Sequence, residues 1–318
     1  MSLLWSYYYA RRLPMDEFLG GLEVPRLRFF ADSGAHSART LGGHIELDDY
    51  ARWIKRWSPW FTIYANLDVI WAAEATWRNQ RRLEDVHGLH PMPVFHTGES
   101  FRALERYLSE GYTYIALGKL LGNPVKSLRP WLEKCFRMAQ GTAVFHGFGL
   151  TVHQLLREFP FYSVDSSSWG SGVRYGALKL FHQGRWVNVM LGNRKSVSRH
   201  RDALEAYAIP VKAMTRGGYD RNVVAGACAI AQYRAADALR AVHGPIALPP
   251  GKGYPPPGTV QHDRVVRASD DAPGLNIFLA EGSTAGHVRH AGGLHLYLAD
   301  SSLRWTYEAA RSIARETA

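Results

Sequence analysis

The sequence contains little cysteine: Cys135 and Cys228 are the only two among 318 residues. Two cysteines cannot by themselves build a disulfide scaffold, a four-cysteine zinc site or an iron–sulfur cluster. The sequence also has no run of about 18 apolar residues, so we expect no membrane-spanning segment and no membrane partner. Its first residues, MSLLWSYYYARR, lack the basic start and the long apolar stretch of a signal peptide, which predicts a cytoplasmic protein.

Several common catalytic motifs are also missing. The GFG at 147–149 is not a dinucleotide fingerprint, because Val152 stands where its third glycine is expected. The glycines around Lys252 lack the spacing of a phosphate-binding loop, and no HExxH or GxSxG motif is present. The 14 histidines include no set at the spacing of a known zinc motif. We therefore expect neither a metal nor a cofactor.

The sequence does have enough apolar residues for a core, and it carries a large positive charge. Hydrophobic residues make up 46% and charged residues 21%, which is typical of a folded protein. The formal net charge of +10 indicates a polyanionic partner, with nucleic acid the first candidate and a membrane surface the second. A basic composition shared by all the proteins of the source cell is the alternative explanation.

Six short runs rich in aromatic and β-branched residues predict strands, and each ends in a polar residue or glycine. They are 26–32 (RLRFFAD), 61–68 (FTIYANLD), 92–96 (MPVFH), 112–118 (YTYIALG), 142–146 (TAVFH) and 161–165 (FYSVD), with 3–9 (LLWSYYY) as a further candidate. Between them, 46–57, 100–108 and 152–159 repeat apolar residues at helical spacing. Successive strand ends lie 19 to 36 residues apart, the size of βα units. This alternation predicts a parallel sheet in a (β/α)8 TIM-barrel-like fold, with an open doubly wound sheet as the alternative.

The pattern changes after Trp169, and we expect residues 1–318 to be one catalytic domain with a large insertion at 170–290. Within it, 175–191 predicts a hairpin turned at Gln183-Gly184, and 222–242 predicts an alanine-rich helix. Residues 244–258 hold six prolines and four glycines, which predicts a loop or linker rather than packed structure. Late strands at 275–280 and 294–299 and a helix at 303–315 would complete the fold.

Three of the predicted strand ends carry an aspartate: Asp32, Asp68 and Asp165. In a barrel these ends converge on one mouth, where a carboxylate can act as a base or a nucleophile. Each Asp-Ser pair alone is better explained by a helix N-cap. Three acids at three equivalent positions are harder to explain in that way.

Five segments, in order, resemble the motifs of the tRNA-guanine transglycosylases. They are FADSGAHSA at 30–38, YANLD at 64–68, ALGKLLG at 116–122, FHGFGLTVHQLL at 145–156 and SVDSSSW at 163–169. Members of that family are TIM barrels that exchange guanine for a 7-deazaguanine base. The resemblance implies that Asp165 is the nucleophile and Asp32 the acid/base. It places the bound base among Ser33, Gly34, Asp68, His96, Gly118, Lys119, His146, Gly147, Ser166 and Trp169.

The family's zinc site, three cysteines and a histidine, has no counterpart here, since Cys228 alone follows Asp165. The sequence is therefore more similar to the DpdA-type branch, often phage-encoded, which inserts 7-deazaguanines into DNA. The expected partners are DNA, with tRNA as the alternative, and a free preQ0-type base. Phosphate contacts are expected from Arg174, Lys179, Arg185, Arg194, Lys195, Arg199 and Arg201, and base stacking from Trp169 or Trp186. A zinc-less tRNA enzyme, an inactive nucleic-acid-binding barrel and an unrelated barrel hydrolase are the other hypotheses.

Overall fold

The structure is a computed structural model, and it describes residues 2–21, 27–167, 175–215, 221–259 and 276–280. The chain divides into two compact units. Unit 1 contains residues 1–13, 25–166 and 242–280, and unit 2 contains residues 14–24, 167–241 and 281–318.

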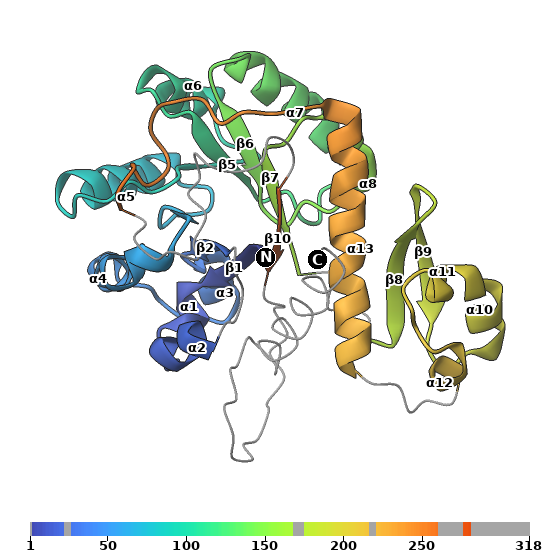
Figure 1. Cartoon of the computed structure of the whole chain (residues 1–318). Helices are drawn as coiled ribbons and strands as arrows, with labels where there is room; N and C mark the ends of the chain where they lie inside the picture. The colour runs from blue at the N-terminus through green and yellow to red at the C-terminus, as the bar shows by residue number, and fades with distance from the viewer. Residues whose placement is uncertain (1, 22–26, 168–174, 216–220, 260–275, 281–318) are drawn as a thin grey trace. The chain divides into compact units, whose positions relative to one another are not determined.

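Unit 1 is built on an eight-stranded sheet in which every pair of neighbouring strands is parallel. The strands are β1 (Ser2–Ser6), β2 (Arg28–Asp32), β3 (Ile63–Tyr64), β4 (Val94–His96), β5 (Tyr114–Gly118), β6 (Val144–Gly147), β7 (Ser163–Ser166) and β10 (Asn276–Ala280). Their order is β3-β2-β1-β10-β7-β6-β5-β4 (Figure 1). The prediction of an α/β protein with a parallel sheet is therefore confirmed.

Hydrogen bonds also link β3 and β4, the two strands that stand last in this order. Ala65 forms a parallel bridge with Met92, directly after β3 and before β4. The Asn66 amide donates to the Met92 carbonyl at 2.9 Å, and the Met92 amide donates to the Tyr64 carbonyl at 2.8 Å. The segment that follows β3 is thus bonded to the segment that precedes β4.

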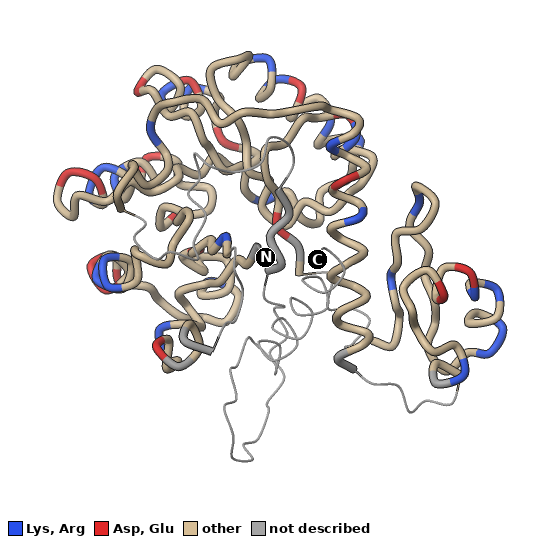
Figure 2. Tube along the Cα trace, viewed as in Figure 1, with Lys and Arg blue, Asp and Glu red and all other residues tan. Residues whose placement is uncertain are grey.

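Helices follow most of these strands in unit 1. They are α1 (Tyr7–Ala10), α3 (Ala35–Thr40), α4 (Leu47–Trp57), a 3-10 turn at Ser58–Trp60, α5 (Ala73–Asp85), α6 (Phe101–Ser109), α7 (Val125–Ala139) and α8 (His153–Glu158). Charged residues gather on these helices rather than along the strands (Figure 2). In α4 the apolar residues recur every three or four positions, so that Tyr50, Trp53 and Ile54 are buried. Ser100 caps α6 by accepting a hydrogen bond from the Arg102 amide.

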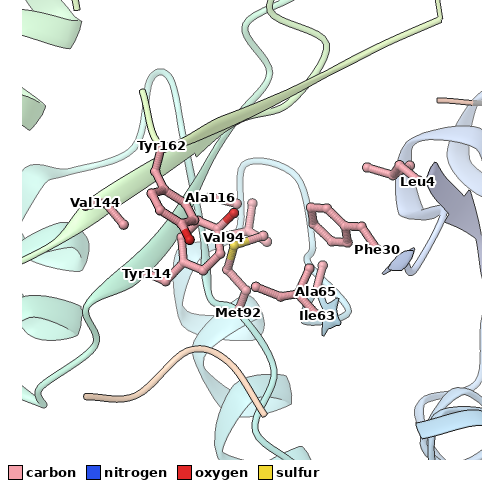
Figure 3. Close-up of a cluster of buried hydrophobic side chains, with 10 residues drawn as sticks. All are labelled: Leu4, Phe30, Ile63, Ala65, Met92, Val94, Tyr114, Ala116, Val144 and Tyr162. Carbon is pink, nitrogen blue, oxygen red and sulfur yellow. The ribbon is translucent and has the colours of Figure 1, made fainter. Parts of the chain in front are cut away.

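Ten buried side chains contributed by successive strands form an apolar core cluster (Figure 3). They are Leu4, Phe30, Ile63, Ala65, Met92, Val94, Tyr114, Ala116, Val144 and Tyr162. The rings of Tyr114 and Tyr162 meet edge to face, with their centroids 5.2 Å apart. This packing fixes the strands relative to one another and so fixes the side chains at their ends.

Unit 2 contains the predicted hairpin and the predicted alanine-rich helix. Strands β8 (Ala177–His182) and β9 (Arg185–Met190) pair antiparallel. Both turn residues, Gln183 and Gly184, have positive φ, as in a two-residue turn of type I′. The remaining helices are α2 (Met15–Gly21), α10 (Arg194–Arg199), α11 (Arg201–Glu205), α12 (Val211–Thr215) and α13 (Arg221–His243), the last of which ends in unit 1. Among the described residues, no helix is both long enough and apolar enough to cross a membrane.

The predicted strands that fall on described residues all extend past the observed ones at one end or both, and two do so by three residues or more. The first strand ends at Ser6, because Tyr7 begins α1 and packs its ring against Tyr50 and Trp53. The strand predicted at 61–68 is reduced to Ile63–Tyr64. Beyond it, a side chain of α5 binds the backbone in place of a neighbouring strand: Asn79 Nδ2 donates to the Leu67 carbonyl. The strand expected at 294–299 and the helix expected at 303–315 lie outside the described residues.

The proline- and glycine-rich segment has no regular structure, as predicted, but it is packed, contrary to the prediction. The Thr113 amide donates to the Lys252 carbonyl at 2.9 Å, directly before β5 begins. Ile246, Leu248 and Tyr254 pack against the core cluster. The prediction from composition failed because the backbone carbonyl groups of an irregular segment can bind a strand end as well as those of a helix or strand can.

Gly253 tests this anchoring. Its φ is +104°, and an added Cβ would lie 2.4 Å from the Tyr114 carbonyl oxygen. We expect Gly253→Ala to lower the free energy of unfolding by about 2 kcal/mol or more, measured by urea denaturation. Gly258→Ala is the matched control, because its φ is +92° but nothing lies within 4 Å of the added Cβ. Equal losses in the two variants would contradict the anchoring.

Candidate active site

Polar side chains stand at the carboxyl ends of several strands of unit 1. Asp32 ends β2, His96 ends β4, and Asp165 lies one residue before the end of β7. Asp68 follows β3 in the loop that leads to α5. Because the strands are parallel, these ends lie at the same edge of the sheet. The structure therefore brings the three predicted aspartates together.

The environment of Asp32 favours a protonated carboxyl. Burial is the largest influence, and the negative charges of Asp68 and Asp165 add to it, so that the pKa rises to about 7. The amides of Ser33 and Gly34 oppose this rise, and the Gly34 amide lies 3.0 Å from Asp32 Oδ2. A carboxyl group with this pKa exists in both forms near neutral pH, as a general acid/base needs.

His96 links Asp68 to Glu99. Its Nε2 lies 2.8 Å from Asp68 Oδ2, its Nδ1 lies 3.1 Å from Glu99 Oε1, and only 2% of the His96 side chain is exposed. Burial alone would lower the pKa of His96, but the hydrogen bonds and charges of the two carboxylates raise it to about 9. His96 is therefore an imidazolium at neutral pH. Its pairing stabilises the fold fully below pH 6.5, and this stabilisation is lost as the pH rises through about 9.

A buried chain of hydrogen bonds supports Asp165 from behind. The Gly149 amide donates to Asp165 Oδ1 at 2.7 Å, and His146 Nε2 lies 3.4 Å from the same oxygen. On the other side of its ring, His146 Nδ1 lies 2.6 Å from Ser163 Oγ, which also bonds the Tyr114 hydroxyl. Asp165 itself is 7% exposed. These contacts hold the carboxylate in one orientation.

His146 differs from His96 in its charge. Burial lowers the pKa of His146 more than the nearby Asp165 raises it, and the rings of Phe30 and Phe148 lie 4.8 and 4.7 Å from its ring. A neutral imidazole has one donor and one acceptor nitrogen. When the Tyr114 hydroxyl donates to Ser163 and Ser163 donates to Nδ1, the His146 Nε2–H points toward Asp165.

A cleft of about 520 Å³ adjoins this group, a volume in the range of small-molecule sites. Its lining comes from the segments after β2 and β3, and it includes Asp68, Arg39, Glu46 and Asn79. Asp68 is thus both bound to His96 and accessible from the cleft. The charge of Asp68 in turn raises the pKa of Asp32.

The other residues assigned to the base lie as follows. Ser33 is buried, with its Oγ 3.5 Å from Asp68 Oδ1, and Gly34 has φ +77° with no room for a Cβ beside Ser6. Gly118 and Gly147 end β5 and β6, and a Cβ on Gly118 would lie 2.6 Å from the His96 ring. Lys119 is exposed and has φ +56°. Ser166 ends β7, with its side chain outside the description, and Trp169 lies outside the described residues.

The candidate nucleic-acid contacts belong to unit 2. Lys179 on β8 lies over the Trp186 ring, with Nζ 4.8 Å from its centroid, and burial lowers the pKa of this lysine. Arg174 lies outside the described residues. The others are exposed and lie on β9, α10 and α11: Arg185, Arg194, Lys195, Arg199 and Arg201 (Figure 2).

Sequence reasoning missed several residues of this site, among them Glu99, Gly149, Ser163 and Tyr114. Ser163 had a signal, because residues two apart on a strand face the same side and Ser163 precedes Asp165 by two. Gly149 was noticed only as part of a failed glycine motif. In the structure, the Glu99 carboxylate bonds both the ring and the backbone amide of His96. Nothing in the sequence indicates this pair.

No family model, curated protein or solved structure matches this chain. Within the described parts of the chain, no group of three or more His, Cys, Asp or Glu side chains is arranged to hold a metal ion. The site is therefore interpreted from its own geometry.

The raised pKa of Asp32 predicts a pH dependence of stability. The folded carboxyl binds its proton up to about pH 7 and the unfolded one only to about 3.8, so the wild type loses stability as the pH rises between these values. We expect the free energy of unfolding of Asp32→Asn, relative to wild type, to increase by about 1 kcal/mol or more from pH 4 to pH 7. Denaturation at several pH values measures this difference. Titration of the Asp32 carboxyl by carbon NMR checks the cause, and a midpoint near 4 would contradict it.

Proposed function

We propose that unit 1 is a (β/α)8 barrel of the TIM type. The order of the strands supports this closure, because it is the chain order of β1 to β7 with β10 placed between β7 and β1. The bridge between Ala65 and Met92 supports it at the remaining seam, between β3 and β4. In such a barrel the carboxyl ends of all eight strands surround one mouth, which is where the polar group lies.

We further propose that the chain exchanges guanine for a 7-deazaguanine base in DNA, through a covalent bond between Asp165 and the sugar. One observation carries this proposal: two neighbouring carboxyl groups have different environments. Asp165 is fixed by the Gly149 amide and faces His146, whereas Asp32 has a pKa of about 7. A fixed nucleophile beside a group that gains and loses a proton near pH 7 is what base exchange needs.

In the first half of the proposed reaction, a carboxylate oxygen of Asp165 attacks C1′ of the target nucleotide. The bond from C1′ to the guanine nitrogen breaks, and its electron pair stays on guanine. Asp32 in its protonated form gives its proton to the leaving base. The negative charge of Asp165 also stabilises the positive charge that develops on the sugar.

The second half reverses these roles. The incoming 7-deazaguanine gives its ring N–H proton to Asp32, and its nitrogen attacks C1′. The bond between C1′ and Asp165 then breaks, which restores the carboxylate and the proton on Asp32. Asp68 is suited to bind the N–H edge of the base, because it lines the cleft and is held by the His96 imidazolium. A base within a duplex must first be flipped out of the stack.

One feature supports DNA rather than tRNA: the sequence lacks the cysteines of the zinc site of the tRNA enzymes. The net charge of +10 suits either nucleic acid. We also propose that the protein works in the cytoplasm, where its nucleic acid substrate is found. A preQ0-type base would be the second substrate.

The test is incorporation of a labelled 7-deazaguanine base into duplex DNA and, in parallel, into tRNA. We expect incorporation into DNA, and we expect Asp165→Asn and Asp165→Ala to reduce it by about three orders of magnitude or more. A covalent complex of protein and DNA should survive denaturing electrophoresis with wild type and be absent with both variants.

Asp85→Asn is the control, because Asp85 is exposed and ends α5, which leads to the opposite ends of the strands. Incorporation into tRNA alone would replace the proposed substrate. Incorporation by Asp165→Ala at the wild-type rate would remove the proposed mechanism.

A further inference from the structure

Trp71 is a large aromatic residue that the proposed chemistry does not use. It lies between β3 and α5, and 55% of the residue is exposed. Its φ is +67°, in the left-handed region that a tryptophan rarely adopts. An exposed tryptophan in a strained conformation gains nothing from burial, so another interaction must account for its position.

Two cations lie over this ring. The Arg39 guanidinium carbon lies 4.1 Å from the centroid of Trp71, and Lys119 Nζ lies 4.2 Å from it. Both side chains are exposed, and neither forms an ion pair with an acid among the described residues. Two like charges therefore meet at one ring, without a carboxylate to neutralise them. Such a site attracts an anion.

Strain occurs at two of these three residues. Lys119 has φ +56°, so Trp71 and Lys119 both adopt the left-handed conformation and contact one another. The Lys119 carbonyl accepts hydrogen bonds from Thr97 and Asn123, which fix its loop. Strained residues that the surroundings hold in place cluster at ligand sites.

The three residues lie beside the candidate active site, within unit 1. Arg39, Asp68 and Val69 line the cleft of about 520 Å³, and Trp71 follows two residues after Val69. Lys119 directly follows Gly118, which approaches the His96 ring. The ring and its two cations thus stand at the carboxyl ends of the strands, where a nucleotide must enter to reach Asp68.

We propose that Trp71, Arg39 and Lys119 form a docking site for a nucleic acid strand, in which a base next to the exchanged nucleotide stacks on Trp71 and the adjoining phosphates bind Arg39 and Lys119. This inference rests on the proposed function for the identity of the neighbouring nucleotide. Base stacking on an aromatic side chain and cation contacts to phosphates are the two elements of single-strand binding sites. A flipped nucleotide leaves the bases beside it partly unstacked, and such a base fits this ring.

Binding is measured by fluorescence anisotropy with a labelled DNA duplex, a labelled single strand and tRNA, all on the Asp165→Asn background so that no exchange occurs. We expect Trp71→Gly to raise the Kd for DNA about tenfold, while Trp71→Phe keeps most of the affinity. Glycine accepts the left-handed φ, so the loss reports on the ring rather than on a misfolded loop. We expect Arg39→Ala with Lys119→Ala to reduce the slope of log Kd against log salt by roughly 1 to 2.

Arg56→Ala is the matched control, because Arg56 also lies over a tryptophan, 4.9 Å from the Trp57 ring centroid, but at the end of α4 that leads toward β3. Unchanged Kd and salt slope in the Trp71 and cation variants would overturn the docking site. So would equal binding of an acidic peptide of the same charge. Failure of base exchange by the wild type would instead remove the proposed function, and the binding result would stand independently of it.

Discussion

The repulsion among buried carboxylates is the constraint on which the rest of the site depends. The register of the parallel strands fixes Asp32 and Asp165, and His96 at the end of β4 binds both Asp68 and Glu99. Two protonations relieve the repulsion. Asp32 takes up a proton because its pKa is about 7, and His96 becomes an imidazolium because its pKa is about 9. The group that the fold must neutralise is therefore also the group that can exchange a proton.

The sequence was sufficient to predict the parts of this arrangement that depend on local pattern. Short apolar runs alternating with helical ones predicted the parallel sheet, and the polar residue at the end of each run predicted which side chains meet. Asp32 and Asp165 were placed together in this way, because parallel strands bring like ends to one edge. The turn at Gln183-Gly184 was equally predictable, since Gly184 readily adopts the positive φ that a two-residue type I′ turn needs.

The remaining features depend on contacts between distant residues, which no local pattern encodes. The strand before Asp68 is only two residues long, because side chains of α5 bind the backbone that follows it. Thr76 Oγ1 accepts from the Val69 amide, and Asn79 Nδ2 donates to the Leu67 carbonyl. Asp68 therefore sits in a loop, where it reaches both His96 and the cleft. The segment at 244–258 was interpreted as a loop or linker from its prolines and glycines, yet it binds the residue before β5. Trp71 carried no signal at all, because an exposed tryptophan acquires meaning only from Arg39 and Lys119 beside it.

Two histidines at comparable strand ends differ in charge, because their surroundings shift their pKa values in opposite directions. His96 lies between two carboxylates, so the attraction of both outweighs the cost of burying its charge. His146 faces one carboxylate on one side and a hydroxyl on the other, and the aromatic rings around it make the charged form too costly. If His146 were charged, it would pair with Asp165 and weaken it as the proposed nucleophile. Because it is neutral, its Nε2 contacts Asp165 at 3.4 Å and leaves the full negative charge on the carboxylate, as the proposed attack on the sugar requires.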